Sequence, residues 1–265
     1  NGVILITTKR GKAGKARVSF TSSYSVQSPT HNYSTMNRSQ DLTFMKNLMW
    51  NKAYTQSSGY TEANSDFNLV TYCPDSNLLD AAGTDFSSTD YDWWKKCTRT
   101  ASIFDNKFDI SGGSDDITYL LSLDNVNQKN LLVNDNFKRN NVRLNLDAKI
   151  RSWWKVGTQI SGSFQNMDGA EPTLWTLYAM NPMVTPYDSD GVTINYEPMN
   201  MARDNPLMGC NITDQERSNY FVGNLYTEIL LPLKGLSYRL NYGNEYRIYH
   251  HFQSNPYGYS ETGEA

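Results

Sequence analysis

The sequence predicts an all-β protein whose antiparallel strands run up and down beside one another. Three observations lead to this prediction. Apolar and polar residues alternate in seven segments, several of these segments are ten or more residues long, and short and long connections alternate between them. Such alternation is typical of a strand with one apolar and one polar face. The 265 residues are enough for one large domain or two small ones.

The alternation is clearest where each face is uniform over a long stretch. From 141 to 150, every even-numbered residue is apolar and every odd-numbered residue is polar. The segment 236–248 places mostly leucine and tyrosine on one face in the same way. The seven predicted strands are Arg17–Val26, Phe104–Ser111, Ile117–Leu123, Asn140–Ile150, Lys155–Gln165, Tyr220–Leu231 and Leu236–Ile248.

Strand length bears on which architecture carries this alternation. Strands of soluble proteins are commonest at about 5–6 residues, whereas a membrane β-strand needs about 9–11. Long strands with one apolar and one polar face suit a wall between lipid and a water-filled lumen. A soluble β-sandwich alternates in the same way and is the commoner fold, so alternation alone leaves both architectures open.

The connections favour the membrane barrel. The short turns lie at 112–116, 151–154 and 232–235, and the long connections at 28–103, 125–138 and 166–218. In an up-and-down sheet this order sorts the short turns to one rim and the long loops to the other, as in outer-membrane barrels. Trp153 and Trp154, in a short turn, fit a position at the membrane interface.

The long connections are predicted to contain helices. Apolar residues recur at helical spacing over 37–54, with Asn37 or Ser39 as the N-cap. A second helix is predicted over 173–180, and it ends before Pro182. The stretch 85–94 is rich in carboxylates and aromatic rings, for which loop packing is favoured over ligand contact.

Composition and motifs exclude several functions. With 24 basic and 27 acidic residues the net charge is −3, so no basic field exists to hold nucleic acid. No apolar run approaches the ~20 residues of a membrane-spanning helix. The H-E-x-x-H, C-x-x-C and G-x-S-x-G motifs do not occur, so no catalytic, cofactor or metal site is predicted. Cys73, Cys97 and Cys210 are expected to be free thiols, with a Cys73–Cys97 bridge as the alternative.

The first twelve residues resemble a signature of a known family. The string N-G-V-I-x-(I/V)-T-T-K-(K/R)-G-K ends the plug domain of the SusC/RagA family of TonB-dependent outer-membrane transporters. It is matched here by Asn1, Gly2, Val3, Ile4, Thr7, Thr8, Lys9, Gly11 and Lys12. The stretches 90–94, 99–101 and 109–114 resemble further motifs of the family, and the resemblance runs over nearly the whole chain. One departure is 123–130, which lacks the glycines that usually end the family's third strand.

The resemblance implies a plug-filled barrel of about 22 strands. Residues 1–12 would end the plug, and residues 13–265 would form the N-terminal part of the barrel, about seven strands with long helix-containing extracellular loops. A strand-like start without Met or signal peptide leads to the expectation of a piece of a longer protein.

The family also implies a function in the outer membrane of Bacteroidetes. Its members import large nutrients, here expected to be an oligosaccharide first and a peptide second. The implied partners are a SusD-like lipoprotein lid, the TonB–ExbB–ExbD complex and outer-membrane lipid, with no cofactor and no catalysis. The residues expected to stack on sugar rings are Trp93, Trp94, Trp175 and Tyr178. A soluble carbohydrate-binding β-domain and a β-rich glycoside hydrolase are the alternatives.

Overall fold

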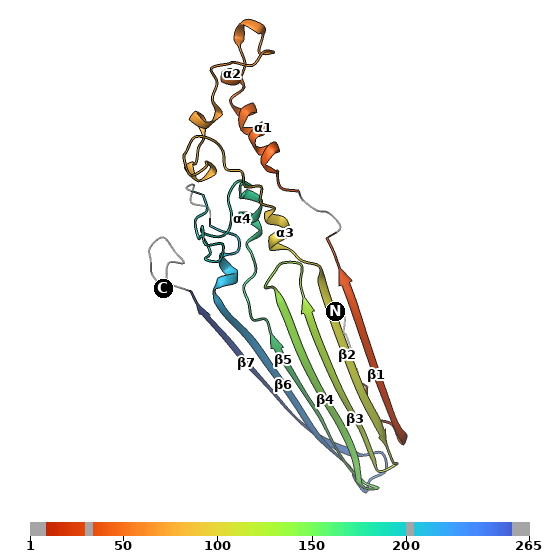
Figure 1. The fold of residues 1–265 in the computed structure, drawn as a ribbon. Coiled ribbons are helices and arrows are strands. Elements are labelled where there is room, and N and C mark those ends of the chain that lie inside the picture. Colours follow the sequence, from red (N-terminus) through yellow and green to blue (C-terminus); the bar gives the residue numbers. More distant parts are fainter. Residues whose placement is uncertain (1–8, 30–33, 200–203, 256–265) are drawn as a thin grey trace.

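A computed structural model describes residues 9–29, 34–199 and 204–255. Seven strands form one antiparallel sheet in which each strand pairs with the next along the chain (Figure 1). This order confirms the predicted up-and-down sheet. The strands are β1 (Gly14–Gln27), β2 (Ala101–Gly113), β3 (Ile117–Lys129), β4 (Asn136–Arg151), β5 (Trp154–Asn166), β6 (Thr213–Leu230) and β7 (Ser237–Ser254).

The strands are longer than the alternation predicted, and one predicted long connection is wrong. Because β3 continues to Lys129 and β4 begins at Asn136, the connection expected over 125–138 shrinks to residues 130–135. Polar pairs extend this hairpin: the Asn141 Nδ2 atom donates to Asp124 Oδ1 at 2.9 Å. Backbone ladders and polar cross-strand pairs therefore continue the strands where apolar alternation stops.

The long loops contain the predicted helices. Asn37 caps α1 (Arg38–Leu48) with a capping box, because its side chain accepts from the Gln40 amide while the Gln40 side chain accepts from the Asn37 amide. The other helices are α2 (Trp50–Ala53), α3 (Trp93–Cys97), α4 (Leu174–Ala179), η1 (Gln56–Ser58), η2 (Leu69–Tyr72), η3 (Ser76–Leu78) and η4 (Met208–Asn211). None of the helices within the described ranges has the length and apolar character needed to cross a membrane.

The hydrophobic core lies among the loops and not on the sheet. Its members are Leu78, Phe86, Trp93, Cys97, Leu177, Met180, Met183, Val184, Met199 and Leu207. On the sheet, large apolar side chains stay open, with Phe20 67% and Leu240 54% exposed. In the described part of the chain no second sheet packs on this apolar face. A soluble β-sandwich would bury that face, whereas a barrel wall presents it to lipid.

Candidate functional site

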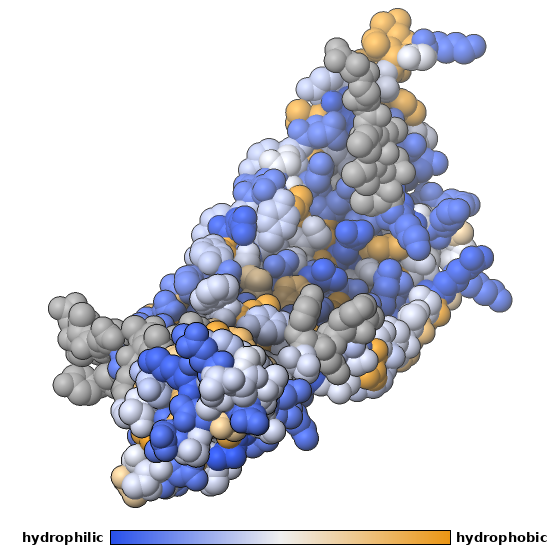
Figure 2. Space-filling model, turned by 90° about the horizontal axis from the view of Figure 1, so that it is seen from above, coloured by the Kyte–Doolittle hydropathy of each residue, from blue (hydrophilic) through white to orange (hydrophobic). Residues whose placement is uncertain are grey.

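The polar face of the sheet forms the inner wall of the candidate site. Cross-strand partners share a face, so Asp109, Ser122 and Arg143 stand in one row across β2, β3 and β4. Opposite charges meet along the wall, as in the ion pairs of Lys107 with Asp109 at 3.7 Å and of Arg139 with Asp124 at 3.6 Å. Viewed from the loop end, hydrophilic side chains predominate (Figure 2). This wall can therefore face water or a polar plug.

The residues just before β1 lie on this inner wall; we call Lys9–Lys12 the leading segment. Asn145 on β4 is 2% exposed, and its Nδ2 atom donates to the Lys9 carbonyl oxygen at 2.7 Å. A Cβ atom at Gly11 would come within 2.3 Å of the Tyr119 carbonyl oxygen. Only glycine permits so close an approach of two backbones. The leading segment is therefore packed directly onto β3 and β4.

A polar cluster holds the leading segment at its second residue. Asp147 accepts a hydrogen bond from the Tyr226 hydroxyl at 2.6 Å and pairs with Arg10 at 3.4 Å. The Arg239 guanidinium lies 4.2 Å from the centre of the Tyr226 ring. Gly157 makes room for this ring, because a Cβ there would lie 2.3 Å from Tyr226 Cε1. We call these five residues the wall anchor.

The loop end places the four predicted stacking residues in different environments. Trp93 is fully buried, and its indole Nε1 atom donates to the Asn181 carbonyl oxygen at 3.0 Å. Both faces of its ring are covered by protein, so no ligand can stack on it here. Trp94 stacks on Tyr178 with ring centres 5.8 Å apart. Trp175 is 79% exposed and is the most open of the four.

The burial of Trp93 follows from how α3 begins. The Asp92 side chain accepts from the Lys95 amide and caps the helix. Trp93 belongs to the hydrophobic cluster of the loops, together with Phe86. Phe86 and Trp93 of the stretch 85–94 therefore pack the loops, while Trp94 keeps a partly open ring.

A polar cavity of about 780 Å³ opens at the loop end of the inner wall. Its lining comes from the loop ends of β3, β4 and β6 and from the connection before α4. It holds the carboxylates of Asp135, Glu171, Asp214 and Glu216, and no lysine or arginine lines it. Leu174, which directly precedes Trp175, also lines the cavity. Carboxylate and amide groups can accept hydrogen bonds from hydroxyl or ammonium groups of a ligand.

Sequence reasoning missed this cavity. Its lining residues come from 128–137, 167–174 and 214–216, which the loops bring together. No motif joins these stretches, and none of them is distinctive by itself. One signal could have indicated the site. Polar residues near the loop ends of the strands, on the face that points to the inner wall, could have been expected to meet there.

The titratable groups of the loops with the largest pKa shifts are buried in the packing of the loops. Burial, followed by the neighbouring Cys210 thiol, raises the pKa of Cys97 to about 12. Burial also raises the pKa of Tyr91. All three cysteines are free thiols, as expected. Among the residues described, no group of histidine, cysteine, aspartate or glutamate side chains could hold a metal ion.

Comparison with known proteins finds similarity to TonB-dependent receptors. No family model matches the chain. TonB-dependent receptor P3 of Formosa agariphila is 23% identical over 92% of this chain and 22% of the relative. TonB-dependent receptor P26 of the same organism is 24% identical over 86% of this chain and 21% of the relative. The chain thus spans about a fifth of the length of these curated relatives.

Solved structures agree with the fold. The RagAB peptide importer in the closed-closed state superposes with a TM-score of 0.62 at 21% identity, over 91% of this chain and 29% of that one. The open-open state gives 0.63 at 22% identity, over 91% and 28%. The matched proteins are TonB-dependent receptors and a peptide importer. Together with the seven-stranded wall, these likenesses make the chain similar to a segment of the SusC/RagA-type TonB-dependent transporters, which are β-barrel proteins of the bacterial outer membrane.

Proposed function

We propose that the protein containing this chain imports a large nutrient across the outer membrane in a TonB-dependent way. The observation that carries the proposal is the two-faced wall: an open apolar face, an ion-paired polar face, and large loops gathered at one end. A wall of this kind separates lipid from a water-filled passage. The likeness to TonB-dependent receptors supports the same conclusion.

Residues 1–12 are proposed to end the plug domain, and residues 13–265 to belong to the barrel. Residues Asn1 to Thr8 of the signature lie outside the described residues, but Lys9, Gly11 and Lys12 are described. The packing of Gly11 on β3 supports a boundary here, because the chain leaves the inner wall and then turns into β1. The remaining signature residues stay a prediction.

An oligosaccharide is the proposed substrate, and the loop end is proposed to receive it. The supporting features are the open ring of Trp175, the stacked pair of Trp94 and Tyr178, and the polar cavity beside α4. Aromatic faces and hydrogen-bond acceptors suit polyhydroxylated rings. A peptide is the second candidate, because the RagAB structures are those of a peptide importer.

The proposed partners are a SusD-like lipoprotein over the loops and the TonB–ExbB–ExbD complex. The loops stand beyond the strand ends as a packed assembly with its own core, which gives a lid protein a firm surface. The two-part name RagAB of the neighbours supports a partner subunit.

Growth experiments test the proposal. The full-length gene is deleted from the source bacterium, and growth is measured on single oligosaccharides, on peptides and on monosaccharides. Loss of growth on oligosaccharides alone, restored by the intact gene, is the expected result. Loss on peptides alone would select the second candidate. Unchanged growth and unchanged uptake on every polymer would contradict an import function.

A further inference from the structure

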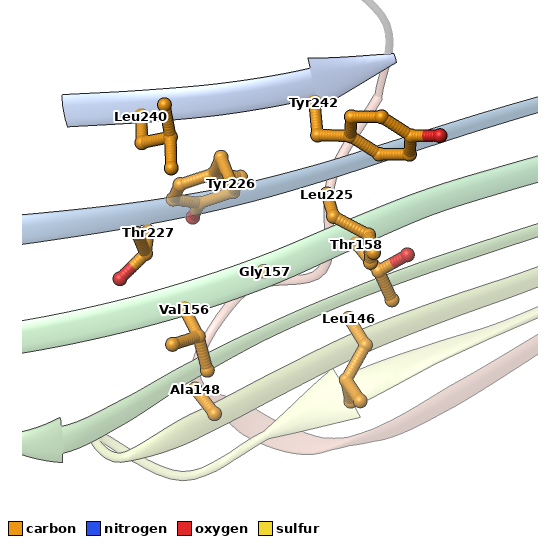
Figure 3. Close-up of a pocket in the computed structure, with 10 residues that line it drawn as sticks. All are labelled: Leu146, Ala148, Val156, Gly157, Thr158, Leu225, Tyr226, Thr227, Leu240 and Tyr242. Atoms are coloured by element: carbon orange, nitrogen blue, oxygen red, sulfur yellow. The ribbon is translucent and has the colours of Figure 1, made fainter. Parts of the chain in front are cut away.

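The apolar face of the sheet carries a groove near the short turns. Its volume is about 400 Å³, and no charged residue lines it. Figure 3 shows the lining side chains in two rows: Ala148, Val156 and Thr227, which we call the groove floor, continue into Leu240, and the second row holds Leu146, Thr158, Leu225 and Tyr242. Because this face meets lipid, the groove opens toward hydrocarbon.

The groove follows from the strand register. Ala148, Val156 and Thr227 are cross-strand partners on β4, β5 and β6, so three small side chains stand side by side. The next row, two residues along each strand, contains Leu146 and Leu225. Two rows lie about 7 Å apart, which is narrower than a helix of about 10–12 Å with its side chains. The groove therefore fits a chain of methylene groups better than a partner helix.

A basic residue stands at the turn end of the groove. Even–odd counting along β4 places Arg151 on the polar face, but the register shifts between Lys149 and Arg151. This shift pairs Arg151 with Trp154, and cross-strand partners share a face. Arg151 therefore stands on the apolar face, one row below Ala148 and next to the turn.

Trp154 marks the boundary between hydrocarbon and head groups. Its indole Nε1 atom donates to the Thr227 hydroxyl at 2.8 Å, which holds the ring beside the groove floor. Its ring stacks on that of Trp153 at 6.1 Å. Tryptophan is enriched where a membrane protein passes from acyl chains to the interface. The groove thus begins at interface level and runs into the hydrocarbon.

We propose that the groove, Trp154 and Arg151 together form a binding site for one phospholipid of the leaflet next to the short turns. An acyl chain fills the groove, because an unfilled apolar hollow forfeits contacts with its lining. The Arg151 guanidinium binds the phosphate, for which its planar fork of donors is well suited. The proposal rests on the outer-membrane location and not on transport of any nutrient.

Native mass spectrometry tests this site in the full-length protein that contains the chain. The detergent-purified protein is titrated with phosphatidylglycerol as the phospholipid probe. Val156→Phe fills the groove and Arg151→Gln removes the phosphate ligand. Val142→Phe makes the same change on the same face outside the groove lining, where Val142 is 39% exposed, and Lys234→Gln removes a cation from another short turn.

One tightly held phosphatidylglycerol is expected for the unaltered protein and for both controls. Val156→Phe and Arg151→Gln should each weaken its binding at least tenfold, with circular dichroism unchanged. If Val156→Phe does not fold, Arg151→Gln decides the result alone. Equal retention by all proteins would overturn the proposal, as would binding of detergent only. Dioleoylglycerol binding as tightly as phosphatidylglycerol would overturn the role of Arg151.

Discussion

The wall anchor makes Asp147→Asn the most informative substitution on the inner wall. Asp147 accepts a hydrogen bond from the Tyr226 hydroxyl at 2.6 Å and forms an ion pair with Arg10 at 3.4 Å. Its side chain is 23% exposed. The amide keeps the size of the carboxyl group but removes its charge. The leading segment should then leave the wall more often, because it keeps only the Asn145 bond, the packing of Gly11 and the contact of Arg10 with the Tyr226 ring, 5.7 Å from the ring centre.

The magnitude follows from the contact that differs between the docked and the open leading segment. The hydrogen bond from Tyr226 to Asp147 joins β6 to β4 and is present in both forms, so its weakening does not favour opening. The ion pair with Arg10 is partly exposed and contributes about 0.5 kcal/mol. Its loss corresponds to roughly twofold more opening of the leading segment.

Trypsin cleavage measures this opening directly, because the leading segment contains Lys9, Arg10 and Lys12. When reclosing is fast, the cleavage rate follows the population of the open form. Cleavage in the full-length protein should therefore become roughly twice as fast in Asp147→Asn.

Asp124→Asn is the matched control. Asp124 also lies on the inner wall, is also 23% exposed, and also binds an arginine and a neutral donor, but it belongs to β3 and does not touch the leading segment. Cleavage in this variant should stay at the original rate. Equal rates in both variants would refute the idea that the wall anchor holds the leading segment.

Three further predictions concern the loops. Trp175→Ala removes a ring that is 79% exposed, so it should weaken oligosaccharide binding in calorimetry without lowering thermal stability; unchanged binding would remove Trp175 from the site. Cys97, buried and with its pKa raised to about 12, should react with iodoacetamide at pH 8 far more slowly than the half-buried Cys73, as read by peptide mass spectrometry; equal labelling would contradict the burial. Burial alone would raise the pKa of Asp168, but hydrogen bonds led by the one from Arg217 lower it. The ionised Asp168 therefore stabilises the folded loop by about 1 kcal/mol or less. This stabilisation is present above pH 3.8 and is lost as the pH falls through the lowered pKa. Protease resistance of the loop 167–173 should therefore fall at low pH, and less so in Asp168→Asn; the same pH profile in both proteins would argue against this ion pair.

Local rules were sufficient for the strands and for the first helix cap. Alternation with period two is a property of neighbouring residues, so it located all seven strands and both faces. The cap of α1 also depends on neighbours, since Asn37 and Gln40 are three residues apart. Strand ends were predicted less well, because the polar part of β3 is held by partners on β4 that alternation does not reveal.

The candidate site depended on contacts between distant residues. Trp93 lies in a stretch of carboxylates and aromatic rings, a composition that suits a ligand contact. Its burial depends on Asn181 and on the hydrophobic core of the loops, whose residues are distant in the sequence. Arg151 was predicted to lie in the short turn 151–154, but the structure pairs it with Trp154 at the end of β4, after a register shift that places it on the apolar face. Such shifts arise from the pairing of two strands and leave no separate mark in one of them.

The amino-acid sequence by itself determined the two-faced strands and their up-and-down order, because side chains alternate along every extended backbone. The tertiary structure alone decided where the leading segment rests, which tryptophan is open, and how the small residues of three strands form a groove. Arg10 and Asp147, for example, are 137 positions apart. Their contact exists only because four paired strands and two glycines bring the leading segment onto the wall.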